Sequence, residues 1–179
     1  GRLVMNKLAR ILKHRWLDSS DTRRRVPDAM AQRLAARVAA SEGRHTGEIR
    51  VCVEAALPLS YLWRLNRQTP MSALTRQRAM SWFGRLRVWD TAHNNGVLIY
   101  LLLAEHSIEF VADRALAAHV GPGQWQGMVD RLSAQLRDGR LEDGLTQALE
   151  EVSAVLVEHF LQPTDAPNPN ELPNLVVRA

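Results

Sequence analysis

The chain of 179 residues is long enough for one hydrophobic core, and its 46% hydrophobic and 23% charged residues are typical of a folded globular protein. Its single cysteine, Cys52, excludes a disulfide framework within the chain and a Cys-x-x-Cys zinc site. The longest uncharged apolar run, residues 97–104, is far shorter than the roughly 20 residues that span a bilayer, and no secretory signal pattern opens the sequence. These features predict a cytoplasmic protein, with peripheral membrane association as an open alternative.

Charge is distributed unevenly along the chain. Residues 1–87 contain 18 Lys and Arg against 6 Asp and Glu, whereas residues 88–179 contain 5 against 13. Such a dipole can orient a protein toward phosphate-bearing or acidic partners, or it reflects basic and acidic faces that pair with each other or with a second copy. No aromatic residues are interleaved with the arginines in a nucleic-acid-binding motif, which makes nucleic acid the least favoured partner.

Residues 1–25 predict a basic amphipathic helix followed by a linker. Apolar residues recur at helical spacing over residues 3–16 among Arg, Lys and His side chains, and the polar stretch after Asp18 breaks the pattern. A helix of this kind can lie on a membrane surface or bind a protein partner, and it can also pack on its own domain. The sequence leaves these alternatives open.

Residues 26–162 predict one α/β domain. The order of elements indicates a three-layer α/β/α sandwich with a small mixed sheet and helices on both faces, in which the first two strands are parallel and the third is antiparallel to the second. The first strand has one apolar face, with Cys52 as a buried, inert thiol opposite it, and the second is apolar throughout. The expected elements are helices over residues 27–43, 71–89, 124–137 and 141–160 and strands over residues 49–53, 96–104 and 108–112.

The last segment, residues 163–179, predicts an extended tail. Four of the eight prolines fall between Pro163 and Pro173, which prevents a regular helix. We expect the tail to add nothing to the core. Its small apolar segment, formed by Leu172, Leu175, Val176 and Val177, can alternatively dock as a peptide in a groove or on a sheet edge, on this chain or another.

The predicted topology brings polar residues to one edge of the sheet, where the two parallel strands begin and the third strand ends. Two carboxylates with amide oxygens are ligands for a hard cation, so calcium or magnesium is a candidate cofactor. The alternative is that Asn94-Asn95-Gly96 is turn chemistry and that Asp113-Arg114 is an ion pair or a helix start. The candidate site residues are Glu48, Asn94, Asn95, Asp113 and Arg114.

The opposite edge of the sheet gathers Glu54, Glu105 and His106. By residue type these form an acid–base trio. Their positions in or beside loops predict that they are solvated.

Three stretches of the sequence together resemble the TPM domain family: Trp89-Asp90-Thr91, the run NNGVLIYLLLA that follows, and IEFVADR. The resemblance covers roughly residues 47–160, with GEIRVCVEAALP as the opening strand. It implies a three-layer α/β/α fold, together with the acid phosphatase activity and divalent-metal binding claimed for plant members. Many bacterial members carry a signal peptide and a membrane helix, and this chain resembles a cytosolic bacterial branch without either.

The chain departs from the family pattern at the candidate metal site. Asn94-Asn95-Gly96 stands where the wider family usually has Asp-Asn-Gly, which removes a carboxylate that a metal site would use. Asp113, in place of a glycine-rich turn, returns one carboxylate to this edge. The favoured function is therefore an accessory or interaction module without strong catalysis. The alternative is a divalent-metal-dependent, acid-phosphatase-like hydrolase with Glu48 and Asp113 as ligands and Arg114 on the phosphate.

Overall fold

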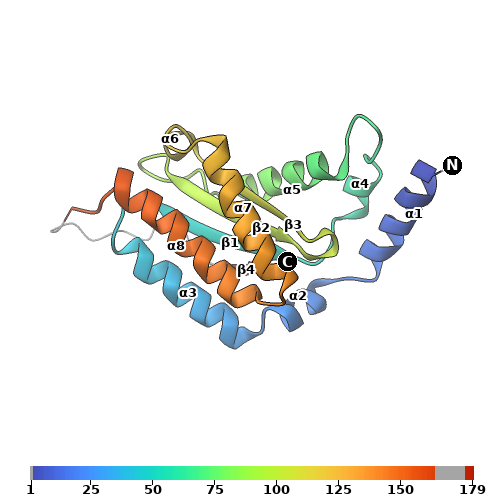
Figure 1. Ribbon diagram of the computed structural model, residues 1–179, viewed down its shortest axis with the longest axis horizontal. Coiled ribbons are helices and arrows are strands. Elements are labelled where there is room, and N and C mark those ends of the chain that lie inside the picture. The colour runs from blue at the N-terminus through green and yellow to red at the C-terminus, as the bar shows by residue number, and fades with distance from the viewer. Residues whose placement is uncertain (1, 164–175) are drawn as a thin grey trace.

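The computed structural model describes residues 2–163 and 176–179 and shows a four-stranded sheet between two layers of helices (Figure 1). The predicted three-layer α/β/α fold is confirmed. The helices are α1 (Arg2–Arg15), α2 (Ser19–Arg25), α3 (Asp28–Glu42), α4 (Leu59–Leu62), α5 (Met71–Arg85), α6 (Arg114–Ala117), α7 (Pro122–Arg137) and α8 (Leu141–His159), with a 3-10 turn η1 (Leu103–Glu105). The strands are β1 (Glu48–Glu54), β2 (Gly96–Leu102), β3 (Ser107–Ala112) and β4 (Val176–Arg178).

The sheet has the strand order β3-β2-β1-β4. β1 and β2 are parallel, as the intervening helix predicted, and β3 runs antiparallel to β2. The tight connection between β2 and β3 contains His106 in the left-handed backbone region, with φ of 49°. As a result, the starts of β1 and β2 and the end of β3 lie at the same edge of the sheet.

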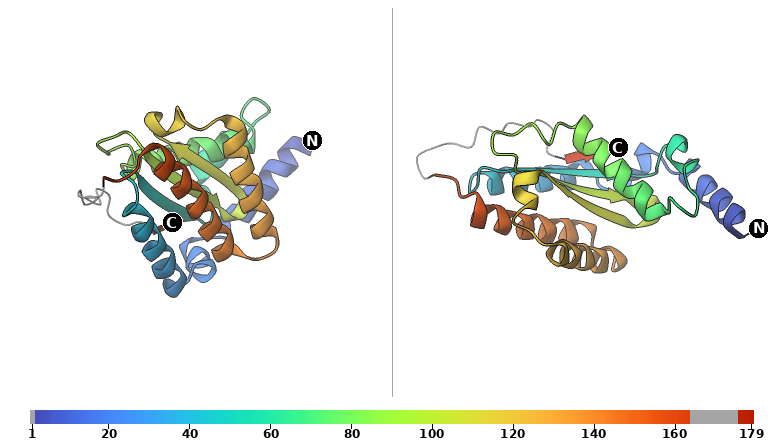
Figure 2. Two further views of the ribbon diagram at one scale, coloured as in Figure 1. Left: turned by 60° about the vertical axis from the view of Figure 1, so that its left-hand side comes forward. Right: turned by 90° about the horizontal axis from the view of Figure 1, so that it is seen from above.

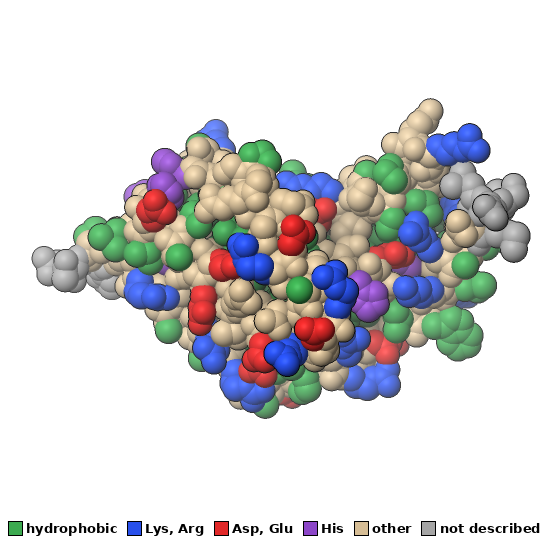
Figure 3. All heavy atoms as spheres, viewed as in Figure 1, with side chains coloured by type: hydrophobic (Ala, Val, Ile, Leu, Met, Phe, Trp, Pro, Cys, Tyr) green, Lys and Arg blue, Asp and Glu red, His purple; other side chains and the backbone are tan. Residues whose placement is uncertain are grey.

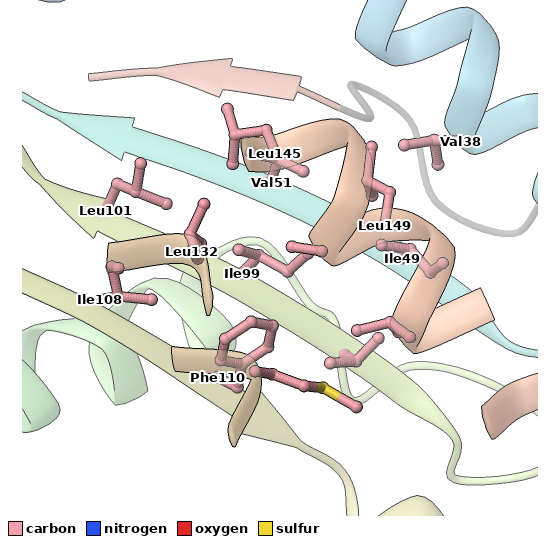
Figure 4. Close-up of a cluster of buried hydrophobic side chains, with 14 of the residues drawn as sticks. Val38, Ile49, Val51, Ile99, Leu101, Ile108, Phe110, Leu132, Leu145 and Leu149 are labelled. Carbon is pink, nitrogen blue, oxygen red and sulfur yellow. The ribbon is translucent and has the colours of Figure 1, made fainter. Parts of the chain in front are cut away.

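The two helix layers cover opposite faces of the sheet, as the view from above shows (Figure 2). On one face, α3, α7 and α8 pack against the apolar side of β1 and the matching residues of β2 and β3 (Figure 4). On the other face, α5 packs over β2 and β3, and the α4 region completes that layer. Among the residues that fill the first core are Ile49, Val51, Ile99, Leu101, Phe110, Leu132, Leu145 and Leu149.

β1 differs from the sequence expectation of a strand with one buried face. All seven of its residues are buried, including Glu48, Arg50 and Glu54. The polar side faces the α5 layer rather than water, so each buried charge needs a partner inside the protein. The partners of Glu48, at the start of β1, and of Glu54, at its end, are described below.

The segment after α1 forms a second helix, α2, where the sequence predicts a linker. Asp18 is the N-cap of α2: its carboxylate accepts hydrogen bonds from the backbone N–H groups of Ser20 and Asp21, and Asp21 returns one to the Asp18 N–H. In the returning bond the Asp18 N–H donates to the Asp21 carboxylate at 2.8 Å, and this reciprocal pattern is a capping box. The polar residues that appeared to end a helix therefore begin one.

The end of the tail pairs with the edge of the sheet, as the alternative of docking on a sheet edge of this chain predicted. This pairing corrects the expectation that residues 163–179 add nothing to the core. β4 pairs in parallel with β1, and the Ala179 N–H donates to the Val53 carbonyl at 2.8 Å. The Thr22 hydroxyl donates to the Ala179 carbonyl at 2.7 Å and so ties α2 to the same strand. The prolines of the tail after Pro163 lie outside the described residues.

None of the helices within residues 2–163 and 176–179 is long and apolar enough to cross a membrane.

Candidate functional site

The strand-start edge is the name we use for the sheet edge formed by Glu48, Asn94, Asn95, Asp113 and Arg114. The register places Glu48 opposite Gly96, and the Asp113 N–H donates to the Gly96 carbonyl at 2.9 Å. The Ala115 N–H donates to the Asn94 carbonyl at 3.0 Å, which joins the start of β2 to the start of α6. The three chain segments that the topology placed together are therefore adjacent.

The Asn94-Asn95-Gly96 segment has clear structural reasons for its residues. Asn94 lies in the left-handed region with φ of 51°, where asparagine is one of the better tolerated residues. A Cβ on Gly96 would lie 2.0 Å from the Val88 carbonyl oxygen, so this position accepts only glycine without a backbone shift. Turn formation and close packing thus account for two of the three residues.

Asn95 is fully buried at the edge. Its side-chain amide donates to the Thr46 hydroxyl at 3.1 Å, and its backbone N–H donates to the Thr91 hydroxyl at 3.2 Å. Its Oδ1 has no hydrogen-bond partner within the described part of the chain. Asn95 therefore holds two loops together and leaves one amide oxygen at the start of β2.

Glu48 is buried beside a second carboxyl that the sequence analysis did not include, Glu42 at the end of α3. Glu42 Oε1 accepts a hydrogen bond from the Ile49 N–H at 3.2 Å. Burial, and then the charge of Glu48 and a hydrogen bond between the two side chains, raise the pKa of Glu42 from 4.5 to about 8. A pKa of about 8 favours the protonated form of Glu42 at neutral pH.

Arg50 supplies the compensating positive charge. Its side chain is buried on the same face of β1 as Glu48, and both Glu42 and Glu48 act electrostatically on its guanidinium. Burial lowers the pKa of Arg50, but arginine remains charged at neutral pH. The positive charge of Arg50 therefore offsets carboxylate charge at this end of β1.

Asp113 and Arg114 form the start of α6, as the structural alternative predicted. Asp113 is the N-cap, and its Oδ1 accepts a hydrogen bond from the Arg114 backbone N–H at 2.8 Å. The Arg114 side chain is exposed. No ion pair joins these two side chains among the described residues.

The donor set of the strand-start edge does not fit calcium or magnesium as these residues are arranged. A hard cation needs several oxygens and takes most of its affinity from carboxylate charge. Here the charge of Arg50 opposes a cation at the Glu42–Glu48 pair, and Asp113 caps a helix. Within residues 2–163 and 176–179, no group of three or more His, Cys, Asp or Glu side chains is arranged to hold a metal ion.

A serine and a histidine lie close together nearby, but their hydrogen bonds exclude an activated nucleophile. His45 Nδ1 accepts from the Gly47 N–H at 3.1 Å, so the proton of the neutral ring lies on Nε2, which is 2.9 Å from Ser41 Oγ. Ser41 donates its own proton to Ser153 Oγ at 2.7 Å. The ring therefore donates to the serine instead of accepting its proton, and the network joins α3 to α8.

The opposite edge of the sheet also differs from the prediction, because Glu54 is buried rather than solvated. The carboxylate accepts two hydrogen bonds from Arg78 at 2.9 and 2.7 Å, one from the Tyr100 hydroxyl at 2.7 Å and one from the Trp82 ring at 3.2 Å. Three of these four donors bond Oε1 and one bonds Oε2. The Arg78–Glu54 pair fixes α5 to the sheet and provides no free acid or base.

Glu105 anchors the N-terminal helix instead of forming a trio with Glu54 and His106. The His14 ring is buried, its Nδ1 accepts from the Leu57 N–H at 2.9 Å, and its Nε2 donates to Glu105 at 2.8 Å. Burial would raise the pKa of Glu105, but this hydrogen bond and the charge of Arg10 outweigh it and lower that pKa. His106 is exposed and lies outside this contact.

The outer face of α1 carries a set of exposed apolar side chains that we name the outer apolar row: Leu8, Leu12 and Trp16. Their exposed fractions are 53%, 57% and 84%. Trp16 lies one residue beyond the end of α1, and its N–H donates to the Leu12 carbonyl at 3.3 Å, which continues the helical spacing of four residues. Hydrophobic and basic side chains lie together at this end of the molecule, on the right in Figure 3.

Comparison with known proteins supports the fold and the family. The solution structure of protein BA42 from the psychrophilic bacterium Bizionia argentinensis matches with a TM-score of 0.70 and 22% identity, covering 86% of this chain and 95% of that one. The N-terminal domain of a P. gingivalis protein matches with a TM-score of 0.55 and 22% identity over 76% of this chain and 82% of that one. No curated protein matches the chain significantly. The family model of the TPM domain matches residues 20–155, and the chain therefore belongs to the TPM domain family.

Proposed function

We propose that this TPM domain is an interaction module without strong catalysis, and that its N-terminal helix provides the binding surface. One observation carries the proposal: α1 is fixed to the domain and yet presents the outer apolar row to solvent. The buried His14 contacts hold the C-terminal end of α1. Lys7 adds a second attachment, because its ammonium donates to the Trp63 carbonyl at 3.1 Å.

The anchored geometry separates α1 from an ordinary surface helix. An amphipathic helix normally turns its apolar stripe toward the core, where burial of a leucine side chain stabilises by about 2 kcal/mol. In α1, Ile11 and His14 face the domain, whereas Leu8, Leu12 and Trp16 face outward. Neighbouring exposed apolar side chains with a basic rim are typical of a surface that binds a partner.

The second candidate function, a divalent-metal-dependent phosphatase-like hydrolase, finds less support in the chemistry of the strand-start edge. It would require Glu48 and Asp113 as ligands and Arg114 as the group that holds phosphate. Glu48 shares a proton with Glu42 and lies beside Arg50. A cation would have to displace that proton and overcome the guanidinium charge.

Turnover of a generic aryl phosphate in the presence of magnesium or calcium tests this proposal. Wild type should show no turnover above the buffer rate, and Asp113→Asn and Arg114→Gln should leave that result unchanged. Thermal midpoints of the variants control for folding. Turnover by the wild type that both substitutions abolish, without loss of folding, would establish the phosphatase and overturn the proposal.

A further inference from the structure

We infer that the partner of the N-terminal helix is an anionic membrane surface, on which α1 lies with the outer apolar row inserted among the lipid headgroups. This inference deepens the proposed function and rests on it. Its first support is the composition of the helix: residues 1–17 contain five Lys and Arg and no Asp or Glu. An interfacial helix combines such a charge with one apolar face.

The exposed charges of α1 are placed where such a helix would use them. Lys13 and Arg15 are exposed next to Leu12 and Trp16, and neither forms an ion pair within the described part of the chain. Their long side chains can reach phosphate and carboxylate headgroups while the leucines insert below. Trp16, at the end of the row, is the residue type most enriched at membrane interfaces.

The neighbouring α4 region extends the same chemistry. Trp63 and Leu59 are exposed beside α1, and the Lys7 ammonium lies 5.5 Å from the centre of the Trp63 ring. Arg64 and Arg67, which follow α4, are exposed and form no ion pair within the described part of the chain. Exposed basic side chains therefore lie on α1 and after α4, which suits a flat sheet of negative headgroups.

A second copy of the chain is a poorer partner for this surface. The acidic helix α8 would attract the basic α1, because α8 contains five Asp and Glu and no Lys or Arg. However, no large hydrophobic side chain is exposed on α3, α7 or α8, whose residues are all described. These three helices therefore offer the outer apolar row no exposed large apolar side chain to pack against.

Flotation of the full chain with lipid vesicles tests the inference. Vesicles of phosphatidylcholine alone are compared with vesicles that contain phosphatidylserine, at low and high salt. The wild type should bind the phosphatidylserine vesicles, and added salt should weaken the binding. Each basic side chain near an anionic surface contributes roughly fivefold, so Lys13→Gln with Arg15→Gln should weaken binding about 30-fold.

Two further variants separate the apolar contribution from general effects of substitution. Leu8→Ser with Leu12→Ser should weaken binding at least about tenfold, because both leucines lose apolar area that inserts. The matched control, Arg137→Gln with Arg140→Gln, removes two exposed charges from the opposite layer and should change binding less than about twofold. All four positions of α1 are exposed, so unchanged thermal midpoints are expected.

The possible outcomes each decide the inference. Absence of binding to phosphatidylserine vesicles, or equal binding by wild type and both α1 variants, overturns it. A concentration-dependent dimer that Leu8→Ser with Leu12→Ser dissolves, without vesicle binding, assigns the row to a second copy instead. Neither result bears on catalysis, which the aryl phosphate assay tests separately. Failure of the membrane inference can therefore be distinguished from failure of the proposed function.

Discussion

Replacement of Glu42 by glutamine should remove most of the loss of stability that the wild type shows as pH rises above neutral. The protonated Glu42 carboxyl accepts from the Ile49 N–H and shares a hydrogen bond with Glu48. A glutamine amide has the same shape, keeps the acceptor oxygen and offers a permanent donor to Glu48. Glu42→Gln therefore mimics the protonated state at every pH.

The magnitude follows from the two pKa values of Glu42. The carboxyl titrates near 4.5 in the unfolded chain and near about 8 in the folded one. Because the folded state holds the proton more tightly, this stabilisation is complete below the unfolded pKa and is lost as pH rises through the folded pKa. At 1.36 kcal/mol per pH unit, the difference between the two pKa values corresponds to a stabilisation of the folded state by about 3 to 5 kcal/mol when Glu42 is fully protonated.

Urea denaturation at about pH 6 and about pH 9 measures the effect. The free energy of unfolding of the wild type should fall between the two by about 3 kcal/mol more than that of Glu42→Gln. Glu150→Gln, an exposed carboxyl on α8, is the control and should behave as the wild type. Parallel pH dependences for wild type and Glu42→Gln would show that Glu42 is ionised in the folded protein and would refute its raised pKa.

Three further substitutions or deletions test other contacts. Removal of residues 176–179 should lower the free energy of unfolding by about 2 kcal/mol and the melting temperature by about 4 to 8 °C, because β4 and its hydrogen bonds are lost. An unchanged melting temperature would show that β4 does not pack against β1. His14→Ala leaves the buried Leu57 N–H without an acceptor and should also cost about 2 kcal/mol in urea denaturation, whereas the exposed control Lys13→Ala should cost little. Gly96→Ala should reduce the yield of folded protein or cost at least about 3 kcal/mol, since its Cβ would lie 2.0 Å from the Val88 carbonyl oxygen; wild-type stability would contradict this packing.

The apolar periodicity of the sequence is sufficient to predict the three layers of the fold and the position of the strand-start edge. The run at β2 and the alternation of Ile49, Val51 and Val53 are local signals, and the parallel pairing follows from the helix between the strands. The family resemblance, which depends on the same β2 run, is confirmed by the match over residues 20–155. Local pattern and topology together placed Asn94 and Asp113 side by side.

The polar contacts could not be predicted in the same way, because each depends on a partner distant in sequence. The sequence predicts a solvated Glu54, but in the fold α5 places Arg78, which is 24 residues away in the sequence, against its carboxylate. Glu42 lies at a helix end, and only the fold shows that its carboxyl points at Ile49. One signal was available: charged residues alternate along β1, and α5 contains three Arg and one Trp. This combination predicts buried polar pairs rather than a solvent-exposed face.

The end of the tail was predicted only as an alternative, docking on a sheet edge, and for a different reason. A three-residue strand after a proline-rich segment has too little pattern to be separated from an extended tail. The Thr22 and Val53 contacts of Ala179 add the long-range pairing that the sequence alone does not reveal.

The most direct test of a non-catalytic strand-start edge is a residue-resolved chemical-shift titration of the full chain with calcium and with magnesium at neutral pH. The charge of Arg50 beside Glu42 and Glu48 predicts no saturable shifts at Asn95, Gly96 or Asp113 below roughly millimolar metal. Saturable shifts at these residues at roughly micromolar metal would contradict it and would show that the edge is a working cation site.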